Sequence, residues 1–150
     1  MKTAVLFVIA ALALAYAQSG SSEPWAASAV IQPAALASQL SDAKARKPAI
    51  LYVGPAVLYR SKHIPGAVLA GPTGTAKGMA SFREALANVP RTADIVIYCG
   101  CCPWDQCPNI RPAFTALAEM GYQRAKVLAL PTSFYKDWIE KGYPVETGLP

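Results

Sequence analysis

Short, almost continuous apolar runs alternate along the chain with segments whose apolar residues recur at helical spacing. The runs at residues 49–53, 94–99 and 126–130 are typical of strands buried on both faces, as in a parallel sheet. Helical spacing predicts one turn over residues 59–63 and helices over residues 33–43, 79–87, 110–120 and 134–141. This alternation predicts an α/β fold with three layers (α/β/α), in which helices cover both faces of a mostly parallel sheet. In such folds, ligands bind beyond the carboxyl ends of the strands.

An uncharged apolar run over residues 4–15 follows Lys2 at the start of the chain, and small residues follow the run. The run is shorter than the roughly 20 residues that span a bilayer, so it predicts a secretory signal peptide over residues 1–17. We therefore expect an exported protein, periplasmic or secreted, with no stable membrane insertion after the signal is removed. The alternative is an uncleaved membrane anchor.

The rest of the chain is expected to form one domain behind a short lead-in. Residues 18–29 are mostly small and polar, so we expect a flexible segment there and a folded domain over residues 30–150. The chain after the signal has 150 − 17 = 133 residues, enough to bury about two thirds of its surface. The last predicted helix is expected to place three aromatic residues in the core: Phe134, Tyr135 and Trp138.

Composition narrows the range of functions. Charged residues make up 15% of the chain, below the roughly 25% of an average soluble domain, which argues against a strongly charged disordered protein. The net charge is +5, but the 14 basic residues are scattered, so no nucleic-acid partner is expected. His63 is the only histidine, which excludes a metal site built from several histidines.

All four cysteines, Cys99, Cys101, Cys102 and Cys107, fall within nine consecutive positions. Cys99 ends a predicted buried strand, and the loop after it leads into the helix over residues 110–120. The first amides of a helix have no partners inside it, and with the helix dipole they stabilise an anion. A thiol held there ionises near neutral pH and needs no separate base to act as a nucleophile. We expect Cys99 to be this thiolate.

Three other interpretations fit the same cysteines. A structural disulfide, such as Cys102 with Cys107, would only fasten the loop, and four cysteines allow three pairings. Buried, inert thiols would carry no chemistry. A thiolate site for a soft ion such as copper(I) is the third, although the adjacent Cys101 and Cys102 are awkward ligands for a tetrahedral ion.

A second stretch, residues 63–67 (His-Ile-Pro-Gly-Ala), changes the picture. It is followed, in order, by a strand ending in Tyr98-Cys99, a helix ending at Gly121, the strand over 126–130, and Trp138 before Gly142-Tyr143-Pro144. In these segments and their order, residues 31–148 resemble the rhodanese-like family. The resemblance implies a rhodanese-like α/β fold and sulfur transfer through a persulfide on Cys99. It also implies that N–H groups from Gly100 onward cradle the persulfide and that His63 is structural.

The chain departs from the pattern of this family at several positions. Tyr52 and Gly54 stand where the family usually has an Asp and an Arg, and Lys62 replaces the usual Gly before the His. The cysteine loop is longer than usual and has no Arg before Arg111. An Arg there would pair with anionic thiosulfate, so its absence argues against thiosulfate as the substrate.

We expect substrate contacts from five residues of this loop and the following helix: Gly100, Cys101, Trp104, Asp105 and Arg111. Trp104 and Asp105 favour an apolar or protein-borne substrate over a small dianion. Trp104 is either a platform for the substrate or a lid on the loop. Arg111 either orients an anion or faces solvent.

The sequence thus leads to the hypothesis of an exported rhodanese-like sulfurtransferase or thiol-redox protein that works through a persulfide or disulfide on residues 99–109. Cys99 is the expected nucleophile, and Cys102 and Cys107 are the expected thiols that resolve or relay the sulfur. We expect no cofactor; the expected partners are a small sulfur donor or thiol acceptor and a redox partner protein. The alternatives are an inactive rhodanese-like module with structural disulfides and a soft-metal (copper) thiolate protein.

Overall fold

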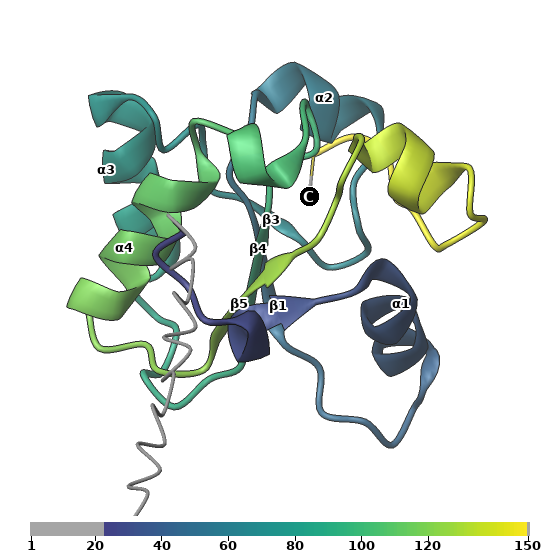
Figure 1. The fold of residues 1–150 in the computed structure, drawn as a ribbon, viewed down its shortest axis with the longest axis horizontal. Helices are drawn as coiled ribbons and strands as arrows, with labels where there is room; N and C mark the ends of the chain where they lie inside the picture. Colours follow the sequence, from purple (N-terminus) through teal and green to yellow (C-terminus); the bar gives the residue numbers. More distant parts are fainter. Residues whose placement is uncertain (1–22, 150) are drawn as a thin grey trace, which may run out of the picture.

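The computed structural model describes residues 23–149, and a five-stranded sheet lies at their centre (Figure 1). Its strands are β1 (Val30–Ile31), β2 (Ala49–Tyr52), β3 (Val68–Leu69), β4 (Ile95–Tyr98) and β5 (Ala125–Leu128). They lie in the order β1-β5-β4-β2-β3, and each neighbouring pair is parallel. All four residues of β4, the central strand, are buried, which explains its continuous apolar sequence.

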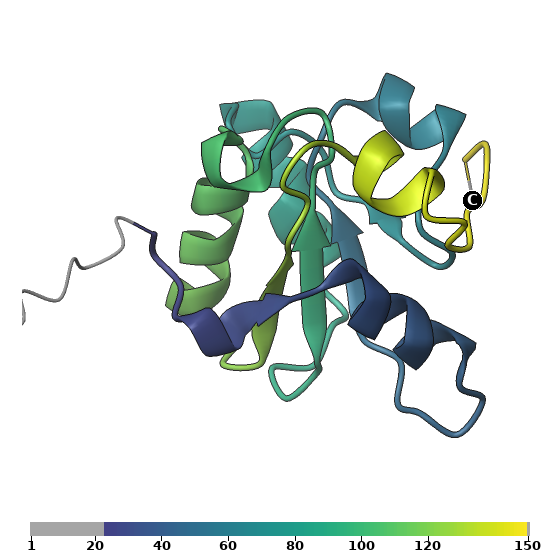
Figure 2. The same ribbon diagram turned by 45° about the vertical axis from the view of Figure 1, so that its right-hand side comes forward.

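Helices cover both faces of this sheet. They are α1 (Pro33–Ser41), α2 (Ala56–Ser61), α3 (Ala76–Ala85) and α4 (Ile110–Glu119). Three shorter turns are η1 (Ala27–Ala29), η2 (Trp104–Gln106) and the π-helical η3 (Tyr135–Ile139). Helices α3 and α4 lie on one face, and α1, α2 and η3 lie on the other (Figure 2). The predicted three-layer α/β/α architecture is confirmed.

The side chains of β4 alternate between the two halves of the core. Ile95 and Ile97 belong to the half under α3 and α4, whereas Val96 and Tyr98 belong to the half under α1, α2 and η3. All four are at most 2% exposed. Full burial of an apolar side chain contributes about 1.5–3 kcal/mol, so β4 is held firmly from both sides. The residue that follows it, Cys99, therefore has a fixed starting position.

Most predicted elements are present with bounds that differ by a few residues. Helix α3 begins earlier than expected because Thr75 caps it: the Gly78 N–H donates to the Thr75 hydroxyl over 3.0 Å. The sequence did not predict β1 and β3, since two-residue strands at the sheet edges carry no pattern of their own. Phe134 and Trp138 are buried as expected, but Tyr135 is 57% exposed because its turn presents it to solvent.

Residues 23–29, expected to belong to a flexible lead-in, pack against the domain. Trp25 is 5% exposed, stacks on Trp104 with ring centroids 5.5 Å apart, and meets Phe114 edge-on. The apolar area of the indole explains this packing, because its burial offsets the cost of ordering the segment. The expected signal peptide over residues 1–17 lies outside the described residues. Within residues 23–149, no helix is long and apolar enough to cross a membrane.

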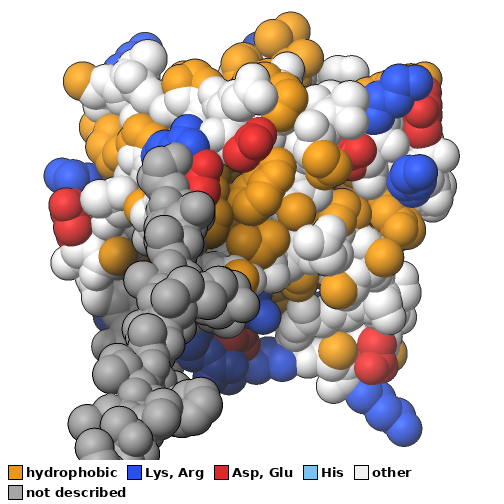
Figure 3. Space-filling view, in the orientation of Figure 1, with side chains coloured by type: hydrophobic (Ala, Val, Ile, Leu, Met, Phe, Trp, Pro, Cys, Tyr) orange, Lys and Arg blue, Asp and Glu red, His pale blue; other side chains and the backbone are white. Residues whose placement is uncertain are grey.

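Hydrophobic side chains also reach the surface. On the face shown in Figure 3 they gather near the middle, while most charged side chains lie toward the margin. The large hydrophobic residues with the greatest exposure are Val57, Leu58, Val68, Tyr135 and Leu149. Two of them, Leu58 and Tyr135, line one pocket beside the cysteine loop.

We expect Trp25→Ala to lower the free energy of unfolding by about 3 kcal/mol, because truncation of a buried indole leaves a cavity. Chemical denaturation measures this change. Ser28→Ala, at an exposed position of the same segment, is the control and should change stability by less than about 0.5 kcal/mol. Equal stability of the two variants would contradict the packing of residues 23–29.

Candidate functional site

The four cysteines lie at the carboxyl end of the sheet, in the loop between β4 and α4 (Figure 2). Cys99 directly follows β4 and is 2% exposed. The loop then forms η2 and ends at Asn109, the N-cap residue of α4. The Trp104 N–H donates to the Leu130 carbonyl over 3.1 Å, which ties the loop to the chain just beyond β5. The loop therefore occupies the edge at which open α/β folds bind ligands.

The sulfur atoms of the four cysteines lie close together. The Cys99 Sγ lies 3.3 Å from the Cys101 Sγ, which lies 3.4 Å from the Cys102 Sγ. The sulfurs of Cys99, Cys101 and Cys107 are all within 4.8 Å of one another. All four cysteines are free thiols, and Cys99 and Cys107 are buried whereas Cys101 is exposed. The Cys102–Cys107 disulfide considered from the sequence is not formed in this structure.

Two glycines allow this close packing. Gly100 has φ +85°, a conformation that favours glycine, and a Cβ there would lie 2.5 Å from the Phe134 Cβ. Its carbonyl accepts from the Phe134 N–H over 3.0 Å, so the start of the loop is fixed to η3. A Cβ on Gly54 would lie 2.9 Å from the Cys99 Sγ and 2.6 Å from the Tyr52 Oη. The backbone after β2 therefore lies in close contact with the Cys99 sulfur.

Asn109 is a candidate site residue that the sequence analysis missed. It is 6% exposed; its Oδ1 accepts from the Gly74 N–H over 2.9 Å, and its backbone carbonyl accepts from the Thr73 hydroxyl. These bonds orient its Nδ2, which donates to the Cys99 Sγ over 3.5 Å. The signal in the sequence was an Asn directly before a predicted helix, where its side chain normally bonds the helix's own amides. Here it bonds to the sulfur instead.

The electrostatics of the cysteine pair differ from the expectation. The Cys99 S–H donates to Cys107, and the N–H groups of Asn109 and Ile110 also point at Cys107; these bonds lower the pKa of Cys107 to about 5 despite its burial. The same bond to Cys107, together with burial, raises the pKa of Cys99. Burial raises the pKa of Cys102 to about 12. The shifts therefore favour a negative charge on Cys107 over one on Cys99.

The direction of the pKa shifts favours a thiolate at Cys107 over one at Cys99, and the role of Cys99 as the nucleophile stays a prediction. The physical principle was right, since the first amides of α4 do stabilise a thiolate. Those amides face Cys107, two residues before Asn109, while Cys99 reaches the loop from the strand side. Cys99 still has stabilising contacts for an anion, from the Cys101 N–H and the Asn109 side chain.

Cys99 opens onto a pocket of about 180 Å³. Aromatic side chains line it, namely Tyr52 at the end of β2 and Phe134 and Tyr135 at η3. Cys107 does not line this pocket and is 0% exposed. The lowered pKa therefore belongs to Cys107, whereas Cys99 is the cysteine that lines the pocket.

Three residues that were expected to contact substrate do not line the pocket: Trp104, Asp105 and Arg111. Trp104 stacks on Trp25 and packs against the core half under α3 and α4, so it covers the loop. Arg111 forms an ion pair with Glu23 at 2.5 Å, so its guanidinium is engaged by the N-terminal segment. Asp105 is exposed. Of the five expected contacts, Gly100 lines the pocket and Cys101 lies beside Cys99.

The sulfurs of Cys99, Cys101 and Cys107 are the group within the described residues that could hold a metal ion. A tetrahedral zinc site needs a fourth ligand, and Cys102 is outside the set of mutually close atoms. A soft ion bound by three thiolates is the metal chemistry that this geometry would allow. A tetrahedral four-cysteine site is not formed.

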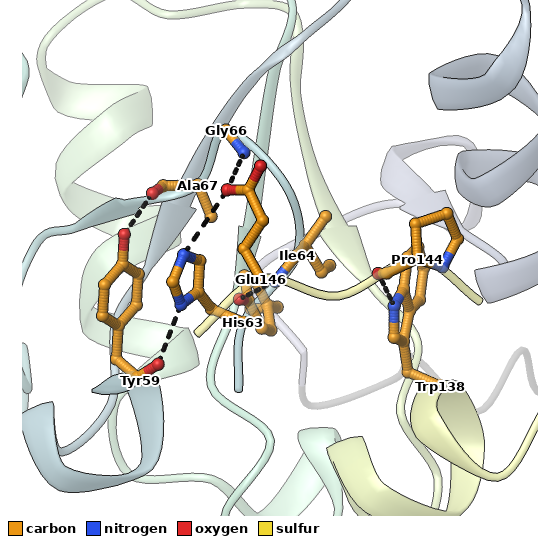
Figure 4. A network of polar contacts seen from close by, with 9 residues as sticks. Tyr59, His63, Ile64, Gly66, Ala67, Trp138, Pro144 and Glu146 are labelled. Atoms are coloured by element: carbon orange, nitrogen blue, oxygen red, sulfur yellow. Dashed lines mark hydrogen bonds and ion pairs between the residues drawn. The ribbon is translucent and has the colours of Figure 1, made fainter. Parts of the chain in front are cut away.

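His63 belongs to a structural network away from the cysteines (Figure 4). Its Nδ1 lies 2.8 Å from the Tyr59 carbonyl, its ring stacks on Tyr59, and it is 4% exposed. Its Nε2 lies 3.7 Å from the Glu146 Oε2, and His63 and Glu146 form an isolated antiparallel bridge. The network fastens the C-terminal segment to the chain before β3, as a structural role of His63 predicts.

We expect the ultraviolet absorbance of one thiolate to persist well below neutral pH and to disappear as the pH falls through about 5, the lowered pKa of Cys107. Cys107→Ser should remove this transition. Cys101→Ser is the matched control and should keep it, because Cys101 does not contribute to the lowered pKa of Cys107. A transition that survives in Cys107→Ser and disappears in a Cys99 variant would assign the charge to Cys99.

Comparisons with known proteins agree with this architecture. No family model and no curated protein matches the chain. The crystal structure of the BH2092 protein from Bacillus halodurans matches with a TM-score of 0.60 and 20% identity, over 79% of this chain and 77% of that one. The crystal structure of the Alr3790 protein from Anabaena sp. matches with a TM-score of 0.59 and 20% identity, over 80% of this chain and 94% of that one.

A third solved structure supplies the name of the fold. The solution NMR structure of the rhodanese-like domain of the Anabaena Alr3790 protein matches with a TM-score of 0.58 and 21% identity, over 79% of each chain. The order of elements and the position of the loop after β4 agree with the resemblance found in the sequence. The chain has the fold of a rhodanese-like domain, with a cluster of four cysteines in the loop after its central strand.

Proposed function

We propose that the protein is a sulfurtransferase that carries sulfur as a persulfide on Cys99. The observation that carries this proposal is that Cys99, alone among the four cysteines, lines the pocket at the carboxyl end of the sheet. A sulfur donor that enters this pocket meets the Cys99 Sγ first. Cys107, although more acidic, is fully buried behind it.

The pair of buried cysteines supplies the nucleophile. The Cys99 S–H donates to the Cys107 thiolate, so the proton can move to Cys107 as Cys99 attacks. The Cys99 thiolate then bonds to the terminal sulfur of a sulfane donor. The sulfur–sulfur bond of the donor breaks, and the leaving group takes the electron pair and the negative charge. Cys107 thus acts as the base that a raised pKa at Cys99 requires.

The contacts around Cys99 suit the persulfide that results. The N–H of Cys101 and the Nδ2 of Asn109 face the Cys99 sulfur, so an anionic sulfur there meets two donors. The other bonds of the Asn109 side chain and backbone fix its orientation before the sulfur arrives. Preorganised donors of this kind stabilise charge without the cost of reorientation.

Cys101 is the thiol that we assign to release of the sulfur. Its Sγ is 3.3 Å from the Cys99 Sγ, and its side chain is exposed. When the Cys101 sulfur attacks the Cys99 sulfur, a Cys99–Cys101 disulfide forms and HS⁻ leaves; the two thiols are oxidised and the carried sulfur is reduced. An external thiol reductant then restores both thiols. This assignment replaces the expectation that Cys102 or Cys107 resolves the persulfide.

We expect Cys99→Ser to abolish the gain of one sulfur atom, measured by intact mass after exposure to a sulfane donor. Cys101→Ser should still gain the sulfur but release sulfide at least about tenfold more slowly, because the neighbouring thiol is missing. Cys102→Ser is the matched control, one residue away, and should behave like the unaltered protein. Sulfur loading that persists in Cys99→Ser would overturn the proposal, and slow release in Cys102→Ser alone would overturn the role of Cys101.

A further inference from the structure

The pocket above Cys99 has mainly apolar walls. Its lining includes Leu58 from α2 and Tyr52 at the end of β2. It also includes three residues from η3 and its start: Phe134, Tyr135 and Ile139. Leu58 and Tyr135 are 42% and 57% exposed, so two large hydrophobic side chains stand uncovered at this pocket. Exposed apolar surface around a nucleophile is typical of a binding site for an apolar group.

The pocket carries little positive charge. Lys62, at the end of α2 and exposed, is the one charged residue among those that line it. The other polar side chains are the hydroxyls of Ser61 and Ser133. Removal of an unpaired charge from water is costly, so a dianion such as thiosulfate would enter with one of its charges uncompensated. A monoanion would pair with Lys62 alone.

The size of the pocket indicates what fits beside the sulfur. Its volume is about 180 Å³. An apolar protein cavity of roughly 150 Å³ takes up benzene, so this pocket accommodates a group of aromatic-ring size. The Tyr52 hydroxyl donates to the Pro55 carbonyl over 3.2 Å, which turns the polar atom of this wall residue toward the backbone.

We propose that the pocket selects a small organic sulfane donor that carries one negative charge and a compact apolar group, in preference to inorganic thiosulfate. This inference rests on the proposed function, because it names the donor for Cys99. An organic thiosulfonate, R–SO₂–S⁻, represents the class. The Cys99 thiolate bonds to its terminal sulfur, the S–S bond breaks, and R–SO₂⁻ leaves with the electron pair, so Cys99–S–S⁻ and a sulfinate are formed.

The test compares kcat/KM for three probes: benzenethiosulfonate, methanethiosulfonate and thiosulfate. Each value is divided by the rate of the same probe with free glutathione, which removes differences in intrinsic reactivity. We expect benzenethiosulfonate to exceed methanethiosulfonate by about 10- to 100-fold, the effect of burying an aromatic ring. Thiosulfate should be the poorest of the three.

Variants of two neighbouring residues locate the preference. Leu58→Ala should lower the ratio of benzenethiosulfonate to methanethiosulfonate about three- to tenfold, because it removes part of the apolar wall. Val57→Ala is the matched control: Val57 precedes Leu58 in α2, is 69% exposed and does not line the pocket, so the ratio should not change. Tyr135→Ala repeats the test from the other wall. Thermal unfolding of each variant checks that the fold is kept.

A charge variant tests whether the pocket selects a donor with one negative charge. Lys62→Gln should lower kcat/KM for both thiosulfonates at least about threefold, because it removes the cation that pairs with them. Arg60→Gln, an exposed basic residue of α2 outside the pocket, should leave both values unchanged.

The outcomes separate this inference from the proposed function. If no probe adds sulfur to Cys99, the proposed function fails. If all three probes load Cys99 with similar normalised rates, or if Leu58→Ala and Val57→Ala have equal effects, the function stands and the apolar selection is overturned. If Lys62→Gln has no effect on the thiosulfonates, the single-charge requirement is overturned.

Discussion

Two buried sulfur atoms, those of Cys99 and Cys107, lie close together between the end of β4 and the beginning of α4. The amides of Asn109 and Ile110 lower the pKa of Cys107, and the contact with Cys107 raises the pKa of Cys99. The arrangement depends on a rigid frame, because the two sulfurs come from different segments, the end of β4 and the loop before α4. The parallel sheet supplies the frame, with β4 buried on both faces.

The sulfur with the lowered pKa, that of Cys107, is therefore different from the sulfur that lines the pocket, that of Cys99. A thiolate in an open pocket would meet any oxidant or alkylating agent that diffuses in. Here Cys107, whose pKa is lowered, does not line the pocket, whereas Cys99, whose pKa is raised, does. Cys101 is exposed and connects the cluster to solvent, whereas Cys107 is buried. The loop thus places two buried thiols and an exposed thiol within nine residues.

The sequence predicted the layers of the fold and the place of the site, because both follow from patterns that are local in the chain. The apolar run before Cys99 indicated a buried strand, and the cysteines after it indicated chemistry at the sheet edge. What the sequence could not predict depends on orientation across the fold. The amides at the start of α4 face Cys107, and the turn at Gly100, with φ +85°, brings Phe134 against the loop; neither follows from a local pattern. The role of Asn109 depends on Thr73 and Gly74, which are far from it in the chain.

The packing of Trp25 on Trp104 connects the first described residues to the middle of the cysteine loop, and the ion pair of Glu23 with Arg111 connects them to the first turn of α4. Both attachments are side-chain contacts, and both brace the stretch of backbone that carries the sulfurs. The N-terminal segment therefore helps to hold in place the loop and the helix start between which the sulfurs lie.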